Sequence, residues 1–445
     1  MKFGKILCVF IFITVISFSA LAQGLPRASQ PEEVGFSSQR LLRLTEAFQA
    51  EVDKGAIPGA VVLIARKGKV AYFEAIGFQN RENGRPMRTD AIFRIASMSK
   101  PITSVAVMML VEEGKIQLLD PVSHYLPEFK GVQVGVEKLN TSTGNSELVG
   151  EPPRQEMTIQ DLLRHTSGLT YGIFGKSLVK QAYNDAKLFD FSQTLAELVS
   201  KIAKLPLAYH PGTTWEYSHS TDVLGRIVEV VSEVAFDQFV ANRIAKPLSL
   251  SDTGFYVPSE KLERIAETQI DPATGKRWPT FDVAKRPNLM SGGAGMVSTA
   301  SDYFRFAQML LNGGELDHVR LLSPRTVAFM TSDHLWPGIA FSPRQDGRLP
   351  RCVRRRSVFG TPWGLIEHVK KYLSCVYLLF ELAVTMNAQL KHQFKLEAGL
   401  VMLLIMTATL VAMVAFALGW LSGYKKACTV HGWHIRREDE KSRRP

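Results

Sequence analysis

Cysteine is scarce in this 445-residue chain and absent from most of its length. Of the four cysteines, one lies near the start and three near the end, at Cys8, Cys352, Cys375 and Cys428. Because residues 9–351 contain none, a disulfide-dense scaffold is excluded, and a chain of this length is stabilised by a large hydrophobic core instead. No cysteine and histidine spacing is typical of a metal site, and we expect no metal.

Most of the chain also lacks net charge. The overall charge is +11, but the part from Phe341 onward holds 17 lysines and arginines against 7 aspartates and glutamates. The residues before it are therefore nearly neutral. A neutral domain lacks the basic surface that nucleic acids require, so we expect no nucleic-acid partner.

Long uncharged runs occur only at the two ends. Residues 1–22 combine two lysines, an apolar run and an Ala-x-Ala ending, which is typical of a cleaved signal peptide and indicates export. Residues 398–421 carry no charge and, at about 1.5 Å per residue, are long enough to span a bilayer. We predict a transmembrane helix there rather than a buried core helix. A basic, irregular juxtamembrane segment would cover residues 341–397, and the basic residues 422–445 indicate a cytoplasmic tail.

The part between these ends is predicted to be one domain over residues 30–340. Residues 59–66 and 69–73 flank Lys67-Gly68, which predicts a β-hairpin. Residues from about 110 to 285 are expected to be mainly helical, with a helix that begins after Thr158. Further helices are predicted over residues 222–231 and 301–311.

The pair Ser97 and Lys100 is the strongest chemical signal in this domain. Residues three apart on a helix share a face, so the two side chains can share a proton. A serine hydroxyl becomes a nucleophile when a neighbouring base takes that proton, and a lysine serves if burial and cationic neighbours lower its pKa. The apolar run at residues 103–111 predicts a buried helix, with Ser97 at its N-terminus. An ordinary helix cap is the alternative.

The same Ser-x-x-Lys spacing occurs twice more, without that context. Ser177 and Lys180 are expected in a polar connection, and Ser422 and Lys425 flank the predicted membrane span. Neither pair begins a buried helix, so we predict no catalytic role for them.

Tyr217 lies in a second notable stretch, residues 210–220, just before a predicted helix. A tyrosine hydroxyl there can point into a cleft, and an ammonium group such as that of Lys100 stabilises a phenolate base. Taken alone, a tyrosine at a cleft edge more often packs as an ordinary side chain.

Together these stretches resemble the serine β-lactamase-related family, which includes class C β-lactamases, D-alanyl-D-alanine carboxypeptidases and β-lactamase-fold esterases. The resemblance covers about residues 30–335. The matching motifs, in order along the chain, are residues 94–100, 162–169, 211–218, 247–255 and 292–299.

This resemblance implies an α+β fold, in which an antiparallel sheet flanked by helices packs on a mostly helical domain with the site between them. It implies that Ser97 is the acylated nucleophile and that Lys100 and Tyr217 move protons for acylation and deacylation. The Ser97 backbone N–H would supply half of an oxyanion hole. No cofactor is implied. His165 lies beside Ser167, but adjacent residues in a turn seldom face each other, so we expect them to shape the helical domain.

Two departures from the family pattern stand out. His219 occupies a place where the family usually has asparagine, and both can bind a substrate carbonyl, although histidine does so with a charge that depends on pH. The family's third motif is also missing after residue 340, where Trp363-Gly364 is only a weak match to it. We therefore expect that the C-terminal sheet strands were lost through a frameshift or a fusion.

The sequence thus predicts an exported, membrane-tethered serine hydrolase that acts on an ester or amide. Its substrate would be a small molecule or a cell-wall peptide, with esterase or peptidase activity favoured over β-lactamase activity. The alternative is a catalytically impaired, membrane-tethered module that binds cell-wall peptides or a partner because one wall of the cleft is lost.

Overall fold

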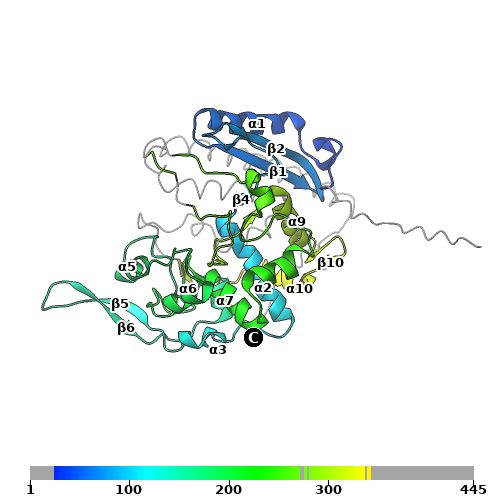
Figure 1. The fold of residues 1–445 in the computed structure, drawn as a ribbon. Coiled ribbons are helices and arrows are strands. Elements are labelled where there is room, and N and C mark those ends of the chain that lie inside the picture. The colour runs from blue at the N-terminus through cyan, green and yellow to red at the C-terminus, as the bar shows by residue number, and fades with distance from the viewer. Residues whose placement is uncertain (1–24, 271–274, 278–279, 336–337, 342–445) are drawn as a thin grey trace, which may run out of the picture. The chain divides into compact units, whose positions relative to one another are not determined.

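The computed structural model describes residues 25–270, 275–277, 280–335 and 338–341 (Figure 1). The chain divides into two compact units, and every described residue lies in the first, Met1–Glu381. The predicted signal peptide at residues 1–22 and the predicted membrane helix at residues 398–421 lie outside the described residues. Within the described ranges, no helix is both long enough and apolar enough to cross a membrane.

The N-terminal part forms an antiparallel sheet in the order β1-β2-β3, with β1 at Gly59–Arg66, β2 at Lys69–Asn80 and β3 at Arg85–Pro86. The predicted hairpin is confirmed, although β2 extends well beyond residue 73. Lys67 and Gly68 both adopt left-handed backbone angles, with φ of 55° and 73°. Two such residues form the turn that matches the twist of paired strands.

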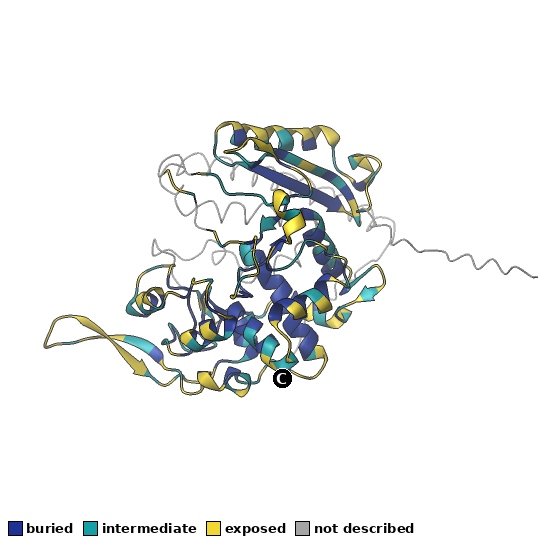
Figure 2. Ribbon diagram, viewed as in Figure 1, coloured by how far each residue is buried: buried dark blue, intermediate teal, exposed yellow. Residues whose placement is uncertain are grey.

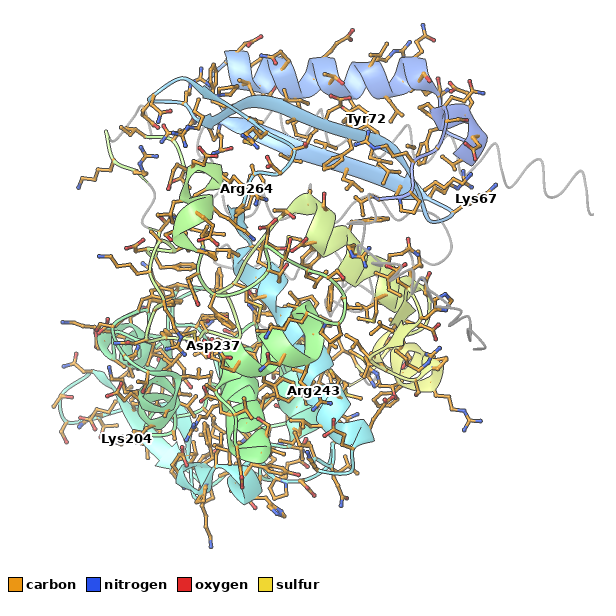
Figure 3. All side chains as sticks on the ribbon, turned by 45° about the vertical axis from the view of Figure 1, so that its right-hand side comes forward. Lys67, Tyr72, Lys204, Asp237, Arg243 and Arg264 are labelled. Carbon is orange, nitrogen blue, oxygen red and sulfur yellow. The ribbon has the colours of Figure 1, made fainter. Side chains whose placement is uncertain are left out.

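The side chains on the two faces of β1 pack into two different hydrophobic clusters. Its even-numbered residues pack under α1 (Ser38–Asp53), where the Tyr72 hydroxyl lies 2.7 Å from that of Thr45 (Figure 3). Its odd-numbered residues pack on the opposite face in a cluster that includes Ala300 of α9 (Ala300–Leu311). Burial on both faces explains why this strand is a continuous apolar run.

α2 (Ser99–Glu112) is the central helix of the helical part. Its residues from Ser99 to Leu110 are all buried (Figure 2), as the apolar sequence predicted. It packs against α7 (Ser220–Ser232) and α8 (Phe236–Val240). The predicted start at Thr158 is confirmed by a capping box at α4 (Ile159–Leu163). The other helices among the described residues are η1 (Pro31–Val34), η2 (Ala96–Met98), α3 (Val122–Tyr125), η3 (Pro127–Phe129), α5 (Leu178–Asp185), α6 (Leu195–Ile202), η4 (Ala241–Ala245), η5 (Ser259–Arg264) and α10 (Pro324–Met330).

A hairpin interrupts the region that was predicted to be mainly helical. Strands β5 (Val134–Leu139) and β6 (Ser146–Glu151) pair with each other and project from the helical part (Figure 1). Most of their side chains are partly or fully exposed, including Leu139. Such strands lack the strict apolar alternation that marks a half-buried strand, and the sequence reading missed them.

Short strand pairs join distant parts of the chain around the centre. β4 (Phe93–Arg94) pairs with β8 (Val297–Ser298), and β11 (Ala340–Phe341) pairs in parallel with β7 (Thr214–Trp215). The remaining pair is β9 (Glu315–Leu316) with β10 (Val319–Arg320). The first two pairs carry the segments that hold Ser97 and Tyr217, so they position the site described below.

Asp302, in the first turn of α9, gives the fold a measurable pH dependence. Its carboxylate accepts the Asp252 N–H at 2.7 Å and the Thr253 hydroxyl at 3.0 Å, yet burial outweighs these bonds and raises its pKa to about 6. A carboxyl that binds its proton more tightly when folded stabilises the fold at low pH and loses that contribution as the pH rises through 6.

We therefore expect Asp302→Asn to gain stability over the natural chain by roughly 2 kcal/mol more at pH 7.5 than at pH 4.5. The asparagine oxygen still accepts hydrogen bonds but carries no charge to bury. Urea unfolding of both proteins at the two pH values measures this difference. An equal difference at both values would contradict the prediction.

Candidate active site

Ser97 lies on a strained turn between β4 and α2. Ala96 has a left-handed φ of 43°, which is rare for a residue with a side chain, and Ser97 follows it in the 3-10 turn η2. The Ser99 hydroxyl donates to the Ala96 carbonyl at 2.7 Å and accepts the Met296 N–H at 3.1 Å. These bonds hold the turn, and Ser97 remains partly exposed at the start of the buried helix.

Lys100 is buried one helical turn further on. Its Nζ atom donates to Ser97 Oγ at 3.1 Å and to the Gly293 carbonyl at 2.7 Å. The same Nζ lies 4.5 Å from the ring centre of Tyr217 and 5.6 Å from that of Tyr171. The structure thus brings Tyr217 next to the local pair Ser97 and Lys100, from which it lies far away in the sequence.

The charge of Lys100 differs from the sequence expectation. Burial lowers the pKa of Lys100, but the interactions with Tyr171, Tyr217 and Asp222 outweigh it, and the pKa is raised above its ordinary value. The condition for a lysine base, a lowered pKa, is therefore not met. Lys100 stays an ammonium ion at neutral pH and can serve as a hydrogen-bond donor and a positive charge.

Aromatic rings surround the ammonium group. The ring of Tyr171 lies 5.3 Å from that of Tyr217 and 4.4 Å from that of His219. Phe174 and Phe189 extend this group outward, and their side chains are 43% and 53% exposed. These exposed rings give the site an apolar wall. The sequence reading missed Tyr171, Phe174 and Phe189 because no motif marks them.

His219 occupies the buried N-terminus of α7. Its Nδ1 atom lies 3.0 Å from Oδ2 of Asp222, while its Nε2 atom is buried and has no hydrogen-bond partner among the described residues. Burial acts to raise the pKa of Asp222, but bonds from His219 and Ser291 outweigh it and hold that pKa below its usual value. The role of His219 in substrate binding stays a prediction.

His165 also lies beside the site, but it does not pair with Ser167. Its Nδ1 atom lies 3.2 Å from the Ser218 hydroxyl, whereas the Ser167 hydroxyl pairs with that of Ser220 at 2.8 Å. Burial and the charge of Lys100 lower the pKa of His165 to about 3, so the ring is neutral at neutral pH. This arrangement favours the predicted role in shaping the helical part.

The second Ser-x-x-Lys pair has a structural role instead of lying in a polar connection. Ser177 caps α5 by accepting the backbone N–H of Lys180 at 3.1 Å. The Lys180 ammonium pairs with the buried Glu216 carboxylate at 3.0 Å. No group of metal-ligating side chains large enough to hold an ion occurs in the part of the chain that the structure describes.

Several known proteins are similar to this chain over a long segment. A profile of the family described as "Beta-lactamase" matches residues 44–364. Protein Rv1367c of Mycobacterium tuberculosis is 37% identical over 286 residues, covering 64% of this chain and 69% of that protein. Esterase EstB of Burkholderia gladioli is 34% identical over 286 residues, covering 59% of this chain and 68% of that protein.

One solved structure adds a similarity in three dimensions. EstCE1, described as a hydrolase with promiscuous acyltransferase activity, has a TM-score of 0.55 at 30% identity, covering 66% of this chain and 77% of that one. These similarities confirm the β-lactamase-like fold that the motifs predicted, while the C-terminal membrane helix stays a prediction. The family match also extends past residue 335 to Gly364, further than the motifs in the sequence indicated.

Proposed function

The chain belongs to the beta-lactamase family, and from this premise we propose that it is a serine hydrolase that forms an acyl-enzyme on Ser97 with an ester substrate. The observation that carries the proposal is the 3.1 Å hydrogen bond from the Lys100 ammonium to Ser97 Oγ, beside the Tyr217 ring. The similarity to an esterase and to a hydrolase with acyltransferase activity supports an ester over an amide substrate.

Acylation begins with loss of the Ser97 proton. Because Lys100 is already protonated, we assign the role of base to Tyr217, whose deprotonated hydroxyl accepts this proton. Ser97 Oγ then forms a bond to the carbonyl carbon, and the Ser97 backbone N–H stabilises the developing oxyanion. When the carbon–oxygen bond to the leaving alkoxide breaks, Tyr217 returns the proton to it.

Deacylation repeats the sequence with water. A water molecule gives a proton to Tyr217 and attacks the acyl carbon, the bond to Ser97 breaks, and Ser97 regains a proton as the free acid leaves. Replacement of the water by an alcohol would give acyl transfer through the same steps.

Tyr217→Phe is expected to lower the acylation rate by roughly 10²- to 10⁴-fold, the range in which a general base contributes. The phenylalanine ring keeps the packing against Tyr171 and removes only the hydroxyl. Stopped-flow release of p-nitrophenol from p-nitrophenyl butyrate measures the rate. Tyr183→Phe, the same change in a buried tyrosine of α5 outside the site, is the matched control and should keep the natural rate. An equal loss in both variants would contradict the role of Tyr217.

The proposed reaction is tested with the full chain in detergent. We expect a fluorophosphonate probe to label the protein and to leave a Ser97→Ala variant unlabelled. Hydrolysis of p-nitrophenyl butyrate should exceed hydrolysis of nitrocefin and release of D-alanine from a D-alanyl-D-alanine peptide. Faster D-alanine release would identify a peptidase. If neither the fluorophosphonate nor a fluorescent penicillin labels the folded chain, the proposal is wrong and the binding module is favoured.

We also propose that the hydrolase domain is exported and anchored in a membrane by residues 398–421. The support is the uncharged run itself and the basic residues that follow it. In a bacterial host, the full chain should stay in the membrane pellet after alkaline carbonate extraction. A variant with Leu403→Arg and Leu410→Arg should be released. Release of the unaltered chain would contradict the anchor.

A further inference from the structure

Asp222 contacts several groups around the catalytic lysine. It lies in the first turn of α7 and is almost completely buried. Its Oδ1 atom accepts the Ser291 hydroxyl at 2.5 Å and the Gly293 N–H at 3.0 Å, while Oδ2 faces Nδ1 of His219 at 3.0 Å. One carboxylate thus fixes a segment that follows it by about seventy residues in the sequence.

Gly293 connects this carboxylate to Lys100 through its two backbone polar groups. Its N–H donates to Asp222, and its carbonyl accepts the Lys100 ammonium at 2.7 Å. The preceding carbonyl, that of Gly292, accepts the hydroxyl of Thr103 on α2 at 2.8 Å. A Cβ atom on Gly293 would lie 3.0 Å from Oδ2 of Asp222, so a glycine allows this close approach.

We propose that Asp222 is a positioning residue that, through the backbone of Gly293, aims the Lys100 ammonium at Ser97 and balances its charge. This inference rests on the proposed function and deepens it. The hydrogen bond to Asp222 fixes the backbone nitrogen of Gly293, and this limits the directions in which the carbonyl of the same residue can face the ammonium group. A buried ammonium also needs a compensating negative charge, since desolvation otherwise removes its proton.

The other titratable groups that act on Lys100 do not supply a permanent negative charge. They are Tyr171, Tyr217 and His165. Burial raises the pKa of Tyr171 and lowers that of His165, so both are uncharged at neutral pH. His219 contacts Asp222 rather than the ammonium. Asp222 is therefore the permanent negative charge beside Lys100, while Tyr217 takes up and releases a proton during the reaction.

Asparagine and alanine at position 222 separate the two parts of the proposal. Asp222→Asn keeps an oxygen for the Gly293 N–H but removes the charge, and Asp222→Ala removes both. We expect acylation of p-nitrophenyl butyrate to slow roughly tenfold in the first and a hundredfold in the second, with KM unchanged. The acylation rate of Asp222→Asn should also fall as the pH is raised from neutral towards 10. The natural chain should keep its rate over this range.

Asp237→Asn is the matched control. Asp237 is a buried carboxylate on α8 (Figure 3), outside the site, and it accepts Nε of Arg286 at 2.9 Å. The same loss of a buried charge there should leave both the acylation rate and its pH profile unchanged. If this control shows the same alkaline fall as Asp222→Asn, the effect is one of general stability and the inference is wrong.

A measurement without substrate separates this inference from the proposed function. In protein labelled with [¹³Cε]lysine, the Lys100 resonance, assigned with a Lys100→Arg variant, should titrate at lower pH in folded Asp222→Asn than in the natural chain. If the natural chain hydrolyses no ester but this titration shifts, the proposed function fails and the positioning role stands. If the titration does not shift, the positioning role is wrong whatever the activity.

Discussion

Ser97→Ala is expected to reduce ester hydrolysis on the order of 10⁴-fold or more, as removal of a serine nucleophile does in other hydrolases. The change removes a single oxygen, which accepts a hydrogen bond from the Lys100 ammonium at 3.1 Å. Because Ser97 is only partly buried and the rest of the turn is held by Ser99, the fold should change in stability by no more than about 1 kcal/mol. Initial rates with p-nitrophenyl butyrate and urea unfolding measure the two effects.

Ser177→Ala is the control for this prediction, because Ser177 has the same spacing to a lysine. It should keep full activity and lose about 1 kcal/mol of stability, since its side chain caps α5. Activity of Ser97→Ala above a tenth of the natural rate would show that another group is the nucleophile.

The relation between Ser97 and Lys100 was predictable from the sequence because it is local. Helix geometry alone places residues three apart on one face, and the apolar run at residues 103–111 indicated that the helix is buried. The turn at Lys67-Gly68 was predictable for the same reason, since two adjacent residues determine it. The motif that contains Tyr217 depended on the family resemblance rather than on spacing.

The groups that set the charge of Lys100 were not predictable, because they come from distant segments. Asp222 acts on the lysine only after α7 packs against α2, and the Gly293 carbonyl contacts it only after the segment around Gly292 is bonded to α2. A lysine base requires burial and cationic neighbours that lower its pKa, but the structure places a carboxylate and two tyrosines around Lys100 instead. Likewise, Ser177 and Lys180 match the pattern, and only the buried contact with Glu216 shows that their lysine has a different partner.

Lys100→Met is expected to lower the acylation rate by roughly 10³-fold or more, because it removes the charge that stabilises both the Tyr217 phenolate and the reactive Ser97 oxygen. Methionine is similar in length, so the packing of the surrounding rings is largely retained. Lys100→Arg keeps the charge, but a planar guanidinium cannot reproduce the bonds of one ammonium to Ser97 and Gly293. We expect it to lose nearly as much activity, measured by stopped-flow acylation.

The stability of the same variants distinguishes a catalytic lysine from a structural one. Lys100→Met alone leaves the Asp222 carboxylate buried without its cation, which should destabilise the fold by about 3 kcal/mol. Adding Asp222→Asn removes that unpaired charge, so the double variant should recover most of the stability while its acylation rate stays as low as that of Lys100→Met. Urea unfolding and stopped-flow assays of the natural chain, both single variants and the double variant complete the cycle. Recovery of activity together with stability would mean that Lys100 only supports the fold, because a group that acts on the Ser97 oxygen cannot be replaced by removing its counter-charge.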